Sequence, residues 1–418
     1  MTENWSDYAD TNWLGSGTAD DPYQISTAAQ LAGISASTST ELNNDYQDYY
    51  FKQTANINLG GKMWTPIKTF RGAYDGDGYS ISGMFVESES NMGGLFAWTW
   101  SADLYNINLK NSVVKTTNMR CGGIVGYLEF GRAINCTSDC QVIIYKGSTI
   151  GTEMRIGGVI GEASYGSTIE NCVNYGNVKS DINIADVGGV VGWIGNIDES
   201  LRVTTVTDCI NYGQVYNAGF YTGGIVGSAN NQTVIERCHN YGDIIVGNHC
   251  AGGIAGYIDE CTIKNCISDA MVSSKEYVGG ILGSSWSENG QTTVENCAVH
   301  GLLYIDNTET TSYVGGILGG LPNSTKPFNM INCSVDAVCN QGAYIFAGQT
   351  EELTGLNIDS CYGQINETKQ YTSGDFSEFG IVPNLNGGSP VHRSFYHVAQ
   401  FSPALSLTWF SENGYDKI

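Results

Sequence analysis

The sequence contains few basic residues. Only 19 lysines and arginines stand against 42 aspartates and glutamates, which gives a formal net charge of −23. Proteins that bind nucleic acid or anionic membrane surfaces need clustered lysine and arginine side chains. The chain also lacks a run of about 18 consecutive apolar residues, which a membrane-spanning helix requires. We therefore expect no nucleic-acid partner and no membrane insertion in this segment.

Familiar catalytic motifs are also missing. None of the five histidines lies in an H-E-x-x-H motif, and no G-x-S-x-G motif occurs at a strand–helix junction. These gaps argue against a zinc protease and an α/β-hydrolase, and we expect no cofactor and no metal. Residues 1–5 do not resemble a signal peptide, which fits either a mature chain cloned without its leader or a protein that is not exported.

Glycine, in contrast, is abundant, and its pattern is periodic. Eight Gly-Gly pairs recur at intervals of 27 to 36 residues, and seven of them continue as G-G-[IV]-x-G. A fixed motif at such a period marks an array of stacked units rather than a globule. The pairs are Gly93-Gly94, Gly122-Gly123, Gly157-Gly158, Gly188-Gly189, Gly223-Gly224, Gly252-Gly253, Gly279-Gly280 and Gly315-Gly316.

Cysteine supplies a second mark in the same register. Eight of the thirteen cysteines follow a short polar turn at the same place in successive units, so we expect a column of buried thiols. Residues inserted between the two marks at 196–202, 285–291 and 321–328 are expected to form exposed loops. The column consists of Cys136, Cys172, Cys209, Cys238, Cys266, Cys297, Cys333 and Cys361.

The segments between these marks are short and rich in Val, Ile, Tyr and Thr, which favours strands over helices. A unit of 27 to 36 residues accommodates three strands of about 5–6 residues with their turns. The sequence therefore predicts an all-β fold, a parallel β-helix (solenoid) of about nine coils. A capping box at Thr27 and Gln30 predicts a small N-terminal helical cap. The repeat fades after Cys361 into an irregular C-terminal cap.

The repeats resemble the GLUG motif of bacterial surface proteins. The fullest copy is S-T-I-E-N-C-V-N-Y-G-N-V at residues 167–178, and residues 15–81 resemble the module that commonly precedes such repeats. The resemblance covers most of residues 15–365. It implies a right-handed β-helix in secreted or surface-anchored proteins, often adhesin-like, and some relatives carry an immunoglobulin A peptidase domain. The expected organisation is an N-terminal cap with the first coils (1–90), the repeat β-helix (91–365) and a C-terminal cap or tail (366–418).

One acidic string is a candidate for chemistry. Asp75-Gly76-Asp77-Gly78 could bind calcium or supply paired carboxylates for a glycosidase. The favoured interpretation is a glycine-rich tight turn between two strands. Polysaccharide lyases and hydrolases use such rods, so a carbohydrate-active β-helix enzyme remains the alternative to a noncatalytic protein.

Five aromatic residues are the candidate binding residues. Tyr175, Tyr212 and Tyr241 stand in three Asn-Tyr-Gly triplets and should stack into a stripe about 10 Å long. Such a stripe either contacts a ligand or packs as a ladder with its asparagines bonded along the stack, and the ladder is favoured. Trp193 and Trp286 are assigned to two of the inserted loops, where they either contact a partner or fold back onto the rod.

The predicted function is therefore that of a noncatalytic β-helix domain at the bacterial cell surface or outside the cell. It acts in adhesion and binding or as a display scaffold, and its expected partner is a glycan or a host or microbial surface protein.

Overall fold

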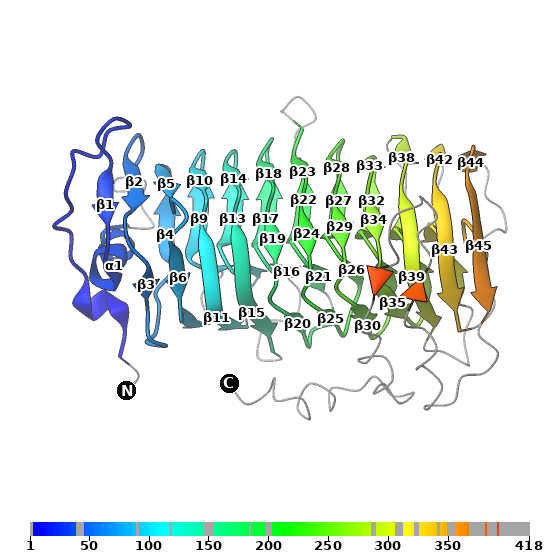
Figure 1. Ribbon diagram of the computed structural model, residues 1–418, viewed down its shortest axis with the longest axis horizontal. Coiled ribbons are helices and arrows are strands. Elements are labelled where there is room, and N and C mark those ends of the chain that lie inside the picture. The colour runs from blue at the N-terminus through cyan, green and yellow to red at the C-terminus, as the bar shows by residue number, and fades with distance from the viewer. Residues whose placement is uncertain are drawn as a thin grey trace.

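The computed structural model describes residues 3–38, 46–88, 92–117, 119–145, 154–183, 185–196, 203–285, 290–305, 312–321, 326–340, 343–348, 356–367, 381–382 and 391–392. The described residues from 3 to 367 form a rod of stacked coils, with strands of successive coils side by side (Figure 1). All strand pairings in the four large sheets are parallel. The fold is therefore the predicted parallel β-helix.

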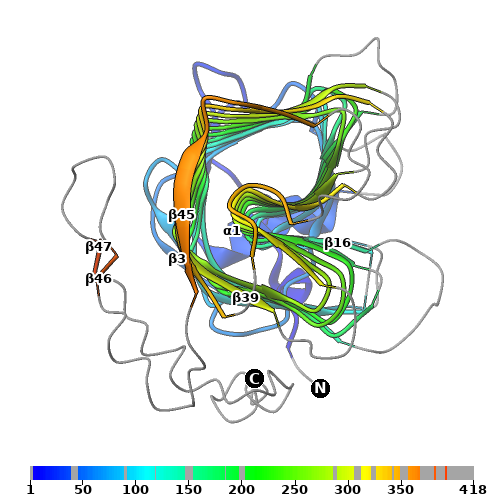
Figure 2. The same ribbon diagram turned by 90° about the vertical axis from the view of Figure 1, so that its right-hand side faces the viewer.

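Each coil runs through the four sheets in the same order. It passes from a twelve-stranded sheet to a sixteen-stranded sheet, then through an eight-stranded sheet into a nine-stranded sheet. In Figure 2 the coils run counterclockwise as the chain advances towards the viewer, which makes the β-helix right-handed. The eight- and nine-stranded sheets form an inward bend of the backbone on one long side of the rod (Figure 2).

The twelve-stranded sheet begins each coil. Its strands are β1 (Tyr23–Ile25), β2 (Tyr50–Gln53), β5 (Ala73–Asp75), β10 (Asp103–Tyr105), β14 (Arg132–Ile134), β18 (Thr168–Glu170), β23 (Thr205–Thr207), β28 (Val234–Glu236), β33 (Thr262–Lys264), β38 (Thr292–Glu295), β42 (Phe328–Ile331) and β44 (Leu356–Asp359).

The sixteen-stranded sheet takes up to two strands from a coil. Its strands are β3 (Ile57–Asn58), β6 (Ser80–Ser82), β7 (Phe85–Ser88), β11 (Asn108–Thr116), β15 (Thr137–Ile144), β19 (Val173–Asn174), β20 (Val178–Ser180), β24 (Ile210–Asn211), β25 (Val215–Asn217), β29 (His239–Asn240), β30 (Ile244–Val246), β34 (Ile267–Ser268), β35 (Met271–Ser274), β39 (Ala298–Ile305), β43 (Ser334–Cys339) and β45 (Tyr362–Glu367).

The remaining two sheets complete the coil. The eight-stranded sheet holds β8 (Met92–Gly93), β12 (Arg120–Cys121), β16 (Met154–Gly157), β21 (Ala185–Gly188), β26 (Tyr221–Gly223), β31 (Cys250–Gly252), β36 (Tyr277–Gly279) and β40 (Tyr313–Gly315). The nine-stranded sheet holds β4 (Ile67–Phe70), β9 (Phe96–Trp100), β13 (Val125–Glu129), β17 (Ile160–Ser164), β22 (Val191–Gly195), β27 (Val226–Asn230), β32 (Ala255–Asp259), β37 (Leu282–Ser285) and β41 (Leu318–Gly320).

The nine strands of that last sheet match the predicted coil number, whereas the twelve-stranded sheet is longer. It contains additional strands from the N-terminal module, such as β1 and β2, which lie before the first Gly-Gly pair of the repeat. The predicted helical cap is α1 (Ala28–Ser37), whose buried face includes Leu31 and Ile34 and lies beside a short 3-10 helix (Trp5–Tyr8). Two short antiparallel strands, β46 (Ile381–Val382) and β47 (Val391–His392), form the only described part of residues 368–418.

The recurring Asn-Cys dipeptide has a conformational cause. From β10 to β44, each coil turns from the twelve- to the sixteen-stranded sheet at a residue with positive φ, for example Asn171 (52°), Asp208 (55°) and Asn265 (56°). Asparagine and aspartate tolerate this left-handed conformation better than most residues. The turn aims the next side chain inward, so Cys172 and Cys209 are fully buried. The predicted column of buried thiols is confirmed for seven of its eight cysteines, and the last one, Cys361, is half-buried.

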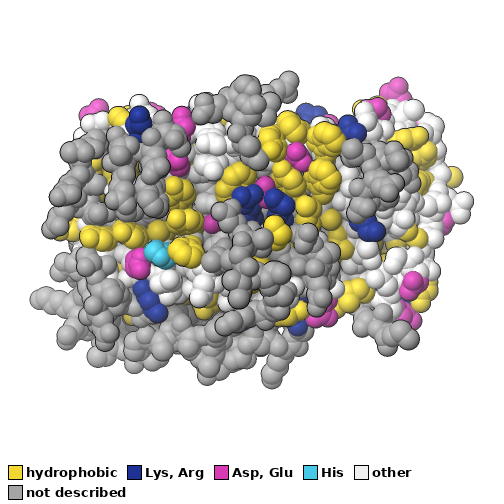
Figure 3. Space-filling model, turned by 180° about the vertical axis from the view of Figure 1, so that it is seen from behind, with side chains coloured by type: hydrophobic (Ala, Val, Ile, Leu, Met, Phe, Trp, Pro, Cys, Tyr) yellow, Lys and Arg dark blue, Asp and Glu magenta, His cyan; other side chains and the backbone are white. Residues whose placement is uncertain are grey.

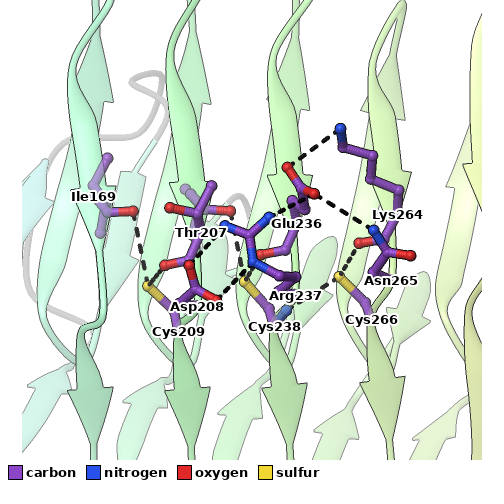
Figure 4. Close-up of polar contacts among 11 residues, drawn as sticks. Ile169, Thr207, Asp208, Cys209, Glu236, Arg237, Cys238, Lys264, Asn265 and Cys266 are labelled. Atoms are coloured by element: carbon purple, nitrogen blue, oxygen red, sulfur yellow. Dashed lines mark hydrogen bonds and ion pairs between the residues drawn. The ribbon is translucent and has the colours of Figure 1, made fainter.

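The thiols are held by backbone carbonyls rather than by disulfides. The Cys209 Sγ donates to the Thr207 carbonyl oxygen at 3.2 Å and to the Ile169 carbonyl of the preceding coil at 3.9 Å, and Cys238 and Cys266 repeat this arrangement (Figure 4). All thirteen cysteines are free. The column is therefore part of the hydrophobic core.

The Gly-Gly pairs occupy the bend between the eight- and nine-stranded sheets. A Cβ atom on Gly223 would lie 2.0 Å from the Val226 carbonyl oxygen and 2.6 Å from that of Ile254. Both contacts are with backbone, which cannot move without disturbing the stack. Glycine recurs here because any side chain would collide with the coil's own backbone and that of its neighbour.

Candidate functional site

The three tyrosines of the predicted stripe do stack. The ring centroids of Tyr175 and Tyr212 are 5.2 Å apart, those of Tyr212 and Tyr241 are 5.0 Å apart, and the rings are parallel within 5°. Tyr175 and Tyr212 remain 53% and 45% exposed. Because the rings cover one another's faces, this stripe presents mostly ring edges and hydroxyl groups to solvent.

A ladder of buried amides lies beneath the stripe. The Asn174 Nδ2 donates to Asn211 Oδ1 at 2.8 Å, and the Asn211 Nδ2 donates to Asn240 Oδ1 at 2.9 Å. All three side chains are fully buried. The structure therefore confirms the predicted ladder of bonded asparagines and packed tyrosines, while ligand binding by the stripe stays a prediction.

The loop assignment of Trp193 is wrong. Trp193 lies in β22, before the insertion, and only 8% of it is exposed. The Arg155 guanidinium lies over its ring at 4.0 Å from the centroid, so the residue packs against the rod instead of projecting from a loop. Trp286 lies outside the described residues.

Trp193 belongs to a seam where the outer faces of the eight- and nine-stranded sheets meet. Arg120 on β12 and Arg155 on β16 reach across to Glu162 on β17, and the Arg155 Nη1–Glu162 Oε2 distance is 2.6 Å. The Arg120 guanidinium also lies 4.8 Å from the ring centroid of Tyr127 on β13. The Glu162 side chain is only 4% exposed, which leaves it enclosed by the two arginines.

Further along the rod, aromatic rings from the eight- and nine-stranded sheets contact each other across the seam. Tyr221 on β26 stacks with Tyr257 on β32 at a centroid distance of 4.6 Å. Figure 3 shows this side of the molecule, where hydrophobic side chains form a band along the rod with a group of basic side chains near its middle. The seam is thus filled by side chains from both sheets.

Three half-buried rings at the N-terminal part of the seam form what we call the aromatic platform: Trp98, Trp100 and Tyr127. The Trp98 ring is parallel to the other two within 9°, at centroid distances of 6.3 and 6.4 Å. These distances exceed the 5.0–5.2 Å of the tyrosine stripe, so the platform rings are less closely stacked than the three tyrosines.

Polar contacts hold the platform rings in place. The Trp98 Nε1 donates to Glu129 Oε2 at 3.0 Å, and the Tyr127 hydroxyl lies 2.9 Å from Ser164 Oγ. The Arg71 guanidinium lies 4.5 Å from the ring centroid of Trp100. Burial raises the pKa of the Glu129 carboxyl and of the Tyr127 hydroxyl. Fixed rings lose little rotamer freedom on binding, which favours affinity.

The acidic string is a turn, as predicted. Asp77 has a φ of 48°, and its backbone N–H donates to Asp75 Oδ1 at 2.9 Å. The Asn106 Nδ2 also donates to Asp75 Oδ1, and Asp77 pairs with Lys52 at 3.2 Å. Both carboxylates thus stabilise the turn. The described residues contain no group of three or more His, Cys, Asp or Glu side chains suited to a metal ion.

The platform was not among the predicted binding residues. Its signal is the string F-A-W-T-W at residues 96–100, where the alternation of a strand places two tryptophans on one outer face. This string stands in the first Gly-Gly unit, the one that departs from G-G-[IV]-x-G.

The described residues define a right-handed parallel β-helix with an aromatic and arginine-lined seam. No family model matches the chain. Halomucin from Haloquadratum walsbyi is 30% identical over 148 residues, which make up 34% of this chain but 2% of halomucin. A crystal structure from Bacteroides ovatus, described as a candidate immunoglobulin A1 protease, has a TM-score of 0.42 and 18% identity, and the match covers 91% of this chain and 94% of that chain. In the described part of the chain, no helix is long and apolar enough to span a membrane.

Proposed function

We propose that this chain is a noncatalytic, secreted or cell-surface β-helix that binds carbohydrate through the aromatic platform in its seam. The single observation behind the proposal is the set of three near-parallel, half-buried rings of Trp98, Trp100 and Tyr127, held by polar partners. Flat aromatic faces favour the C–H faces of sugar rings, and a wet aromatic surface accommodates both apolar and polar contacts. The surface location rests on the resemblance of the repeats to GLUG proteins.

Charge supports a sugar over a polyanion as the ligand. Around the platform three arginines (Arg71, Arg120 and Arg155) stand against the two carboxylates of Glu129 and Glu162, which leaves one excess positive charge in a chain of net charge −23. The seam therefore offers little excess positive charge for a strongly acidic partner.

A carbohydrate-active enzyme is the second candidate, and the Glu129–Glu162 pair favours it. Paired carboxylates in unlike environments are the usual acid and base of glycosidases. Glu162 weighs against this function, because two arginines bind it and only 4% of its side chain is exposed. A carboxylate that must contact water or a glycosidic oxygen needs access that Glu162 lacks.

Binding of the full chain to a panel of soluble oligosaccharides, measured by calorimetry, tests the proposal. Trp98→Ala with Trp100→Ala should weaken binding at least about 10-fold, which corresponds to about 1.4 kcal/mol. Tyr79→Ala, an exposed aromatic in the turn before β6, serves as the matched control and should bind like the parent. Equal binding by the double variant and the parent would remove the platform from the function.

Catalysis is tested on the same panel by following product release. We expect none. Reproducible release that Glu129→Gln abolishes would promote the enzyme over the binding protein.

A further inference from the structure

The turn that follows the platform contains two residues that fit their backbone poorly. The residues after β9, β13, β17, β27 and β32 form one column along the rod, and each adopts a left-handed conformation with φ between 53° and 57°. The column contains Ser101, Phe130, Tyr165, Asn231 and Glu260.

Phe130 and Tyr165 are the two aromatic residues of this column. Bulky side chains are rare at positive φ, whereas asparagine and other short polar residues tolerate it. Asn231 shows that the chain uses a better-suited residue at the same turn, with a φ of 56°. Two aromatic residues in adjacent coils thus impose backbone strain, and strain retained in a fold points to a function at that place.

The two rings also leave one aromatic face open. Phe130 and Tyr165 stack at a centroid distance of 4.9 Å and an angle of 17°, so Tyr165 covers one face of Phe130. The neighbour on the other side of Phe130 is Ser101, whose side chain carries no ring. Phe130 is correspondingly 40% exposed.

This pair continues the platform around the corner of the rod. Phe130 directly follows Glu129, which binds Trp98, and Tyr165 directly follows Ser164, which binds Tyr127. Ser101 directly follows Trp100. The open face of Phe130 is therefore on the side of Ser101, the small residue that follows the platform strand β9.

From this arrangement we propose that Phe130, backed by Tyr165, forms an end subsite for one uncharged sugar ring of a glycan that lies along the platform. The subsite rests on the proposed function and specifies its ligand as neutral carbohydrate. The sugar stacks on the open face of Phe130 above Ser101, with Trp100 beside it. Tyr165 acts as a positioning residue because it contacts Phe130 instead of the ligand.

The local charges favour a neutral sugar. Glu129 directly precedes Phe130 in the chain, and the Arg120 and Arg155 guanidinium groups are already paired with Glu162. Burial, with Glu129 and Glu162, also raises the pKa of the Tyr165 hydroxyl. A uronic acid or a sialic acid would bring another carboxylate close to Glu129 and would be repelled.

The test uses the full chain, neutral hexasaccharides of glucose, mannose and xylose, and oligogalacturonate as the acidic probe. Phe130→Asn installs the residue that the chain itself has at Asn231, so thermal stability should be unchanged or higher. Binding of the best neutral hexasaccharide should fall at least 10-fold. Tyr165→Asn should reduce binding by a smaller factor, and Tyr79→Asn should leave it unchanged.

The outcomes separate this subsite from the proposed function. If the platform variant loses binding while Phe130→Asn binds like the parent, the subsite is refuted and the platform stands. If the parent binds oligogalacturonate in preference to every neutral hexasaccharide, the neutral-sugar assignment is refuted. If Phe130→Asn lowers the melting temperature but leaves binding unchanged, the Phe130–Tyr165 pair has a purely structural role. If the parent binds no sugar of the panel, both proposals fail.

Discussion

Truncation of one buried amide should destabilise the middle of the rod strongly. Asn211 makes four hydrogen bonds: its Oδ1 accepts from the Gly213 N–H and from Asn174 Nδ2, and its Nδ2 donates to the Gly213 carbonyl and to Asn240 Oδ1. In Asn211→Ala, Asn174 and Asn240 each keep a bond to a glycine of their own coil. The N–H and carbonyl of Gly213 each lose the bond that Asn211 provides.

The magnitude follows from these partners. Two buried backbone groups left without their bonds cost about 1–3 kcal/mol each, and two lost ladder bonds cost about 1 kcal/mol each. Water that enters the space offsets part of this cost, so we expect Asn211→Ala to lower the free energy of unfolding by about 3–5 kcal/mol.

Urea unfolding followed by circular dichroism measures the loss, and amide hydrogen exchange locates it. Exchange should quicken in the coils of Asn174, Asn211 and Asn240 and not near α1, because each coil contacts mainly its neighbours. Tyr212→Ala is the matched control, since the adjacent side chain is 45% exposed. A loss below about 1 kcal/mol, or an equal loss in the control, would refute the reasoning.

Two further predictions concern buried thiols outside the cysteine column and the glycines of the repeat. Burial raises the pKa of Cys121, Cys250 and Cys261 to about 12, above the value of about 8.5 in an unfolded chain. Stability from these thiols is complete below about pH 8 and is lost as the pH rises towards 12, which urea titrations at increasing pH will show. Gly223→Ala should cost about 3 kcal/mol or more in the same assay, because its Cβ meets backbone. Gly60→Ala meets no atom within 4 Å, so its positive φ should cost only about 1–2 kcal/mol; similar losses in both would contradict the packing argument.

The coil architecture was predictable because each coil repeats the same short-range requirements on backbone conformation and packing. The Asn-Cys dipeptide encodes a left-handed turn followed by an inward thiol, and the Gly-Gly pair encodes a close approach of backbones. The N-terminal cap was also predictable in kind. The Thr27 Oγ1 accepts a hydrogen bond from the Gln30 backbone N–H at 3.2 Å, as a capping box requires. The Gln30 Oε1, however, accepts from the backbone N–H of Ser26 rather than from that of Thr27.

The seam was not predictable from local patterns. Arg120 and Glu162 are 42 residues apart, and they meet only because the coil bends inward between two sheets. A strand pattern shows that both side chains point outward, but it does not show that two outward faces touch each other. Trp193 was assigned to an inserted loop, either contacting a partner or folded back onto the rod, and it lies instead in β22, where Arg155 covers its ring.

The stacking of coils suggests how structural and functional columns differ in this molecule. In-register parallel strands place like residues on like residues, so a coil-to-coil packing requirement repeats one side chain, as in the column of Asn174, Asn211 and Asn240. A ligand contacts only a few coils. Residues that bind a ligand should therefore differ from the side chain that repeats at the same position in the other coils. The tyrosine stripe repeats with its amides, which fits a packing role. Trp98, Tyr127 and Glu162 occupy one column with three different side chains, and Phe130 replaces the polar residues of another. By this criterion the seam and its corner, rather than the stripe, are where binding should be sought.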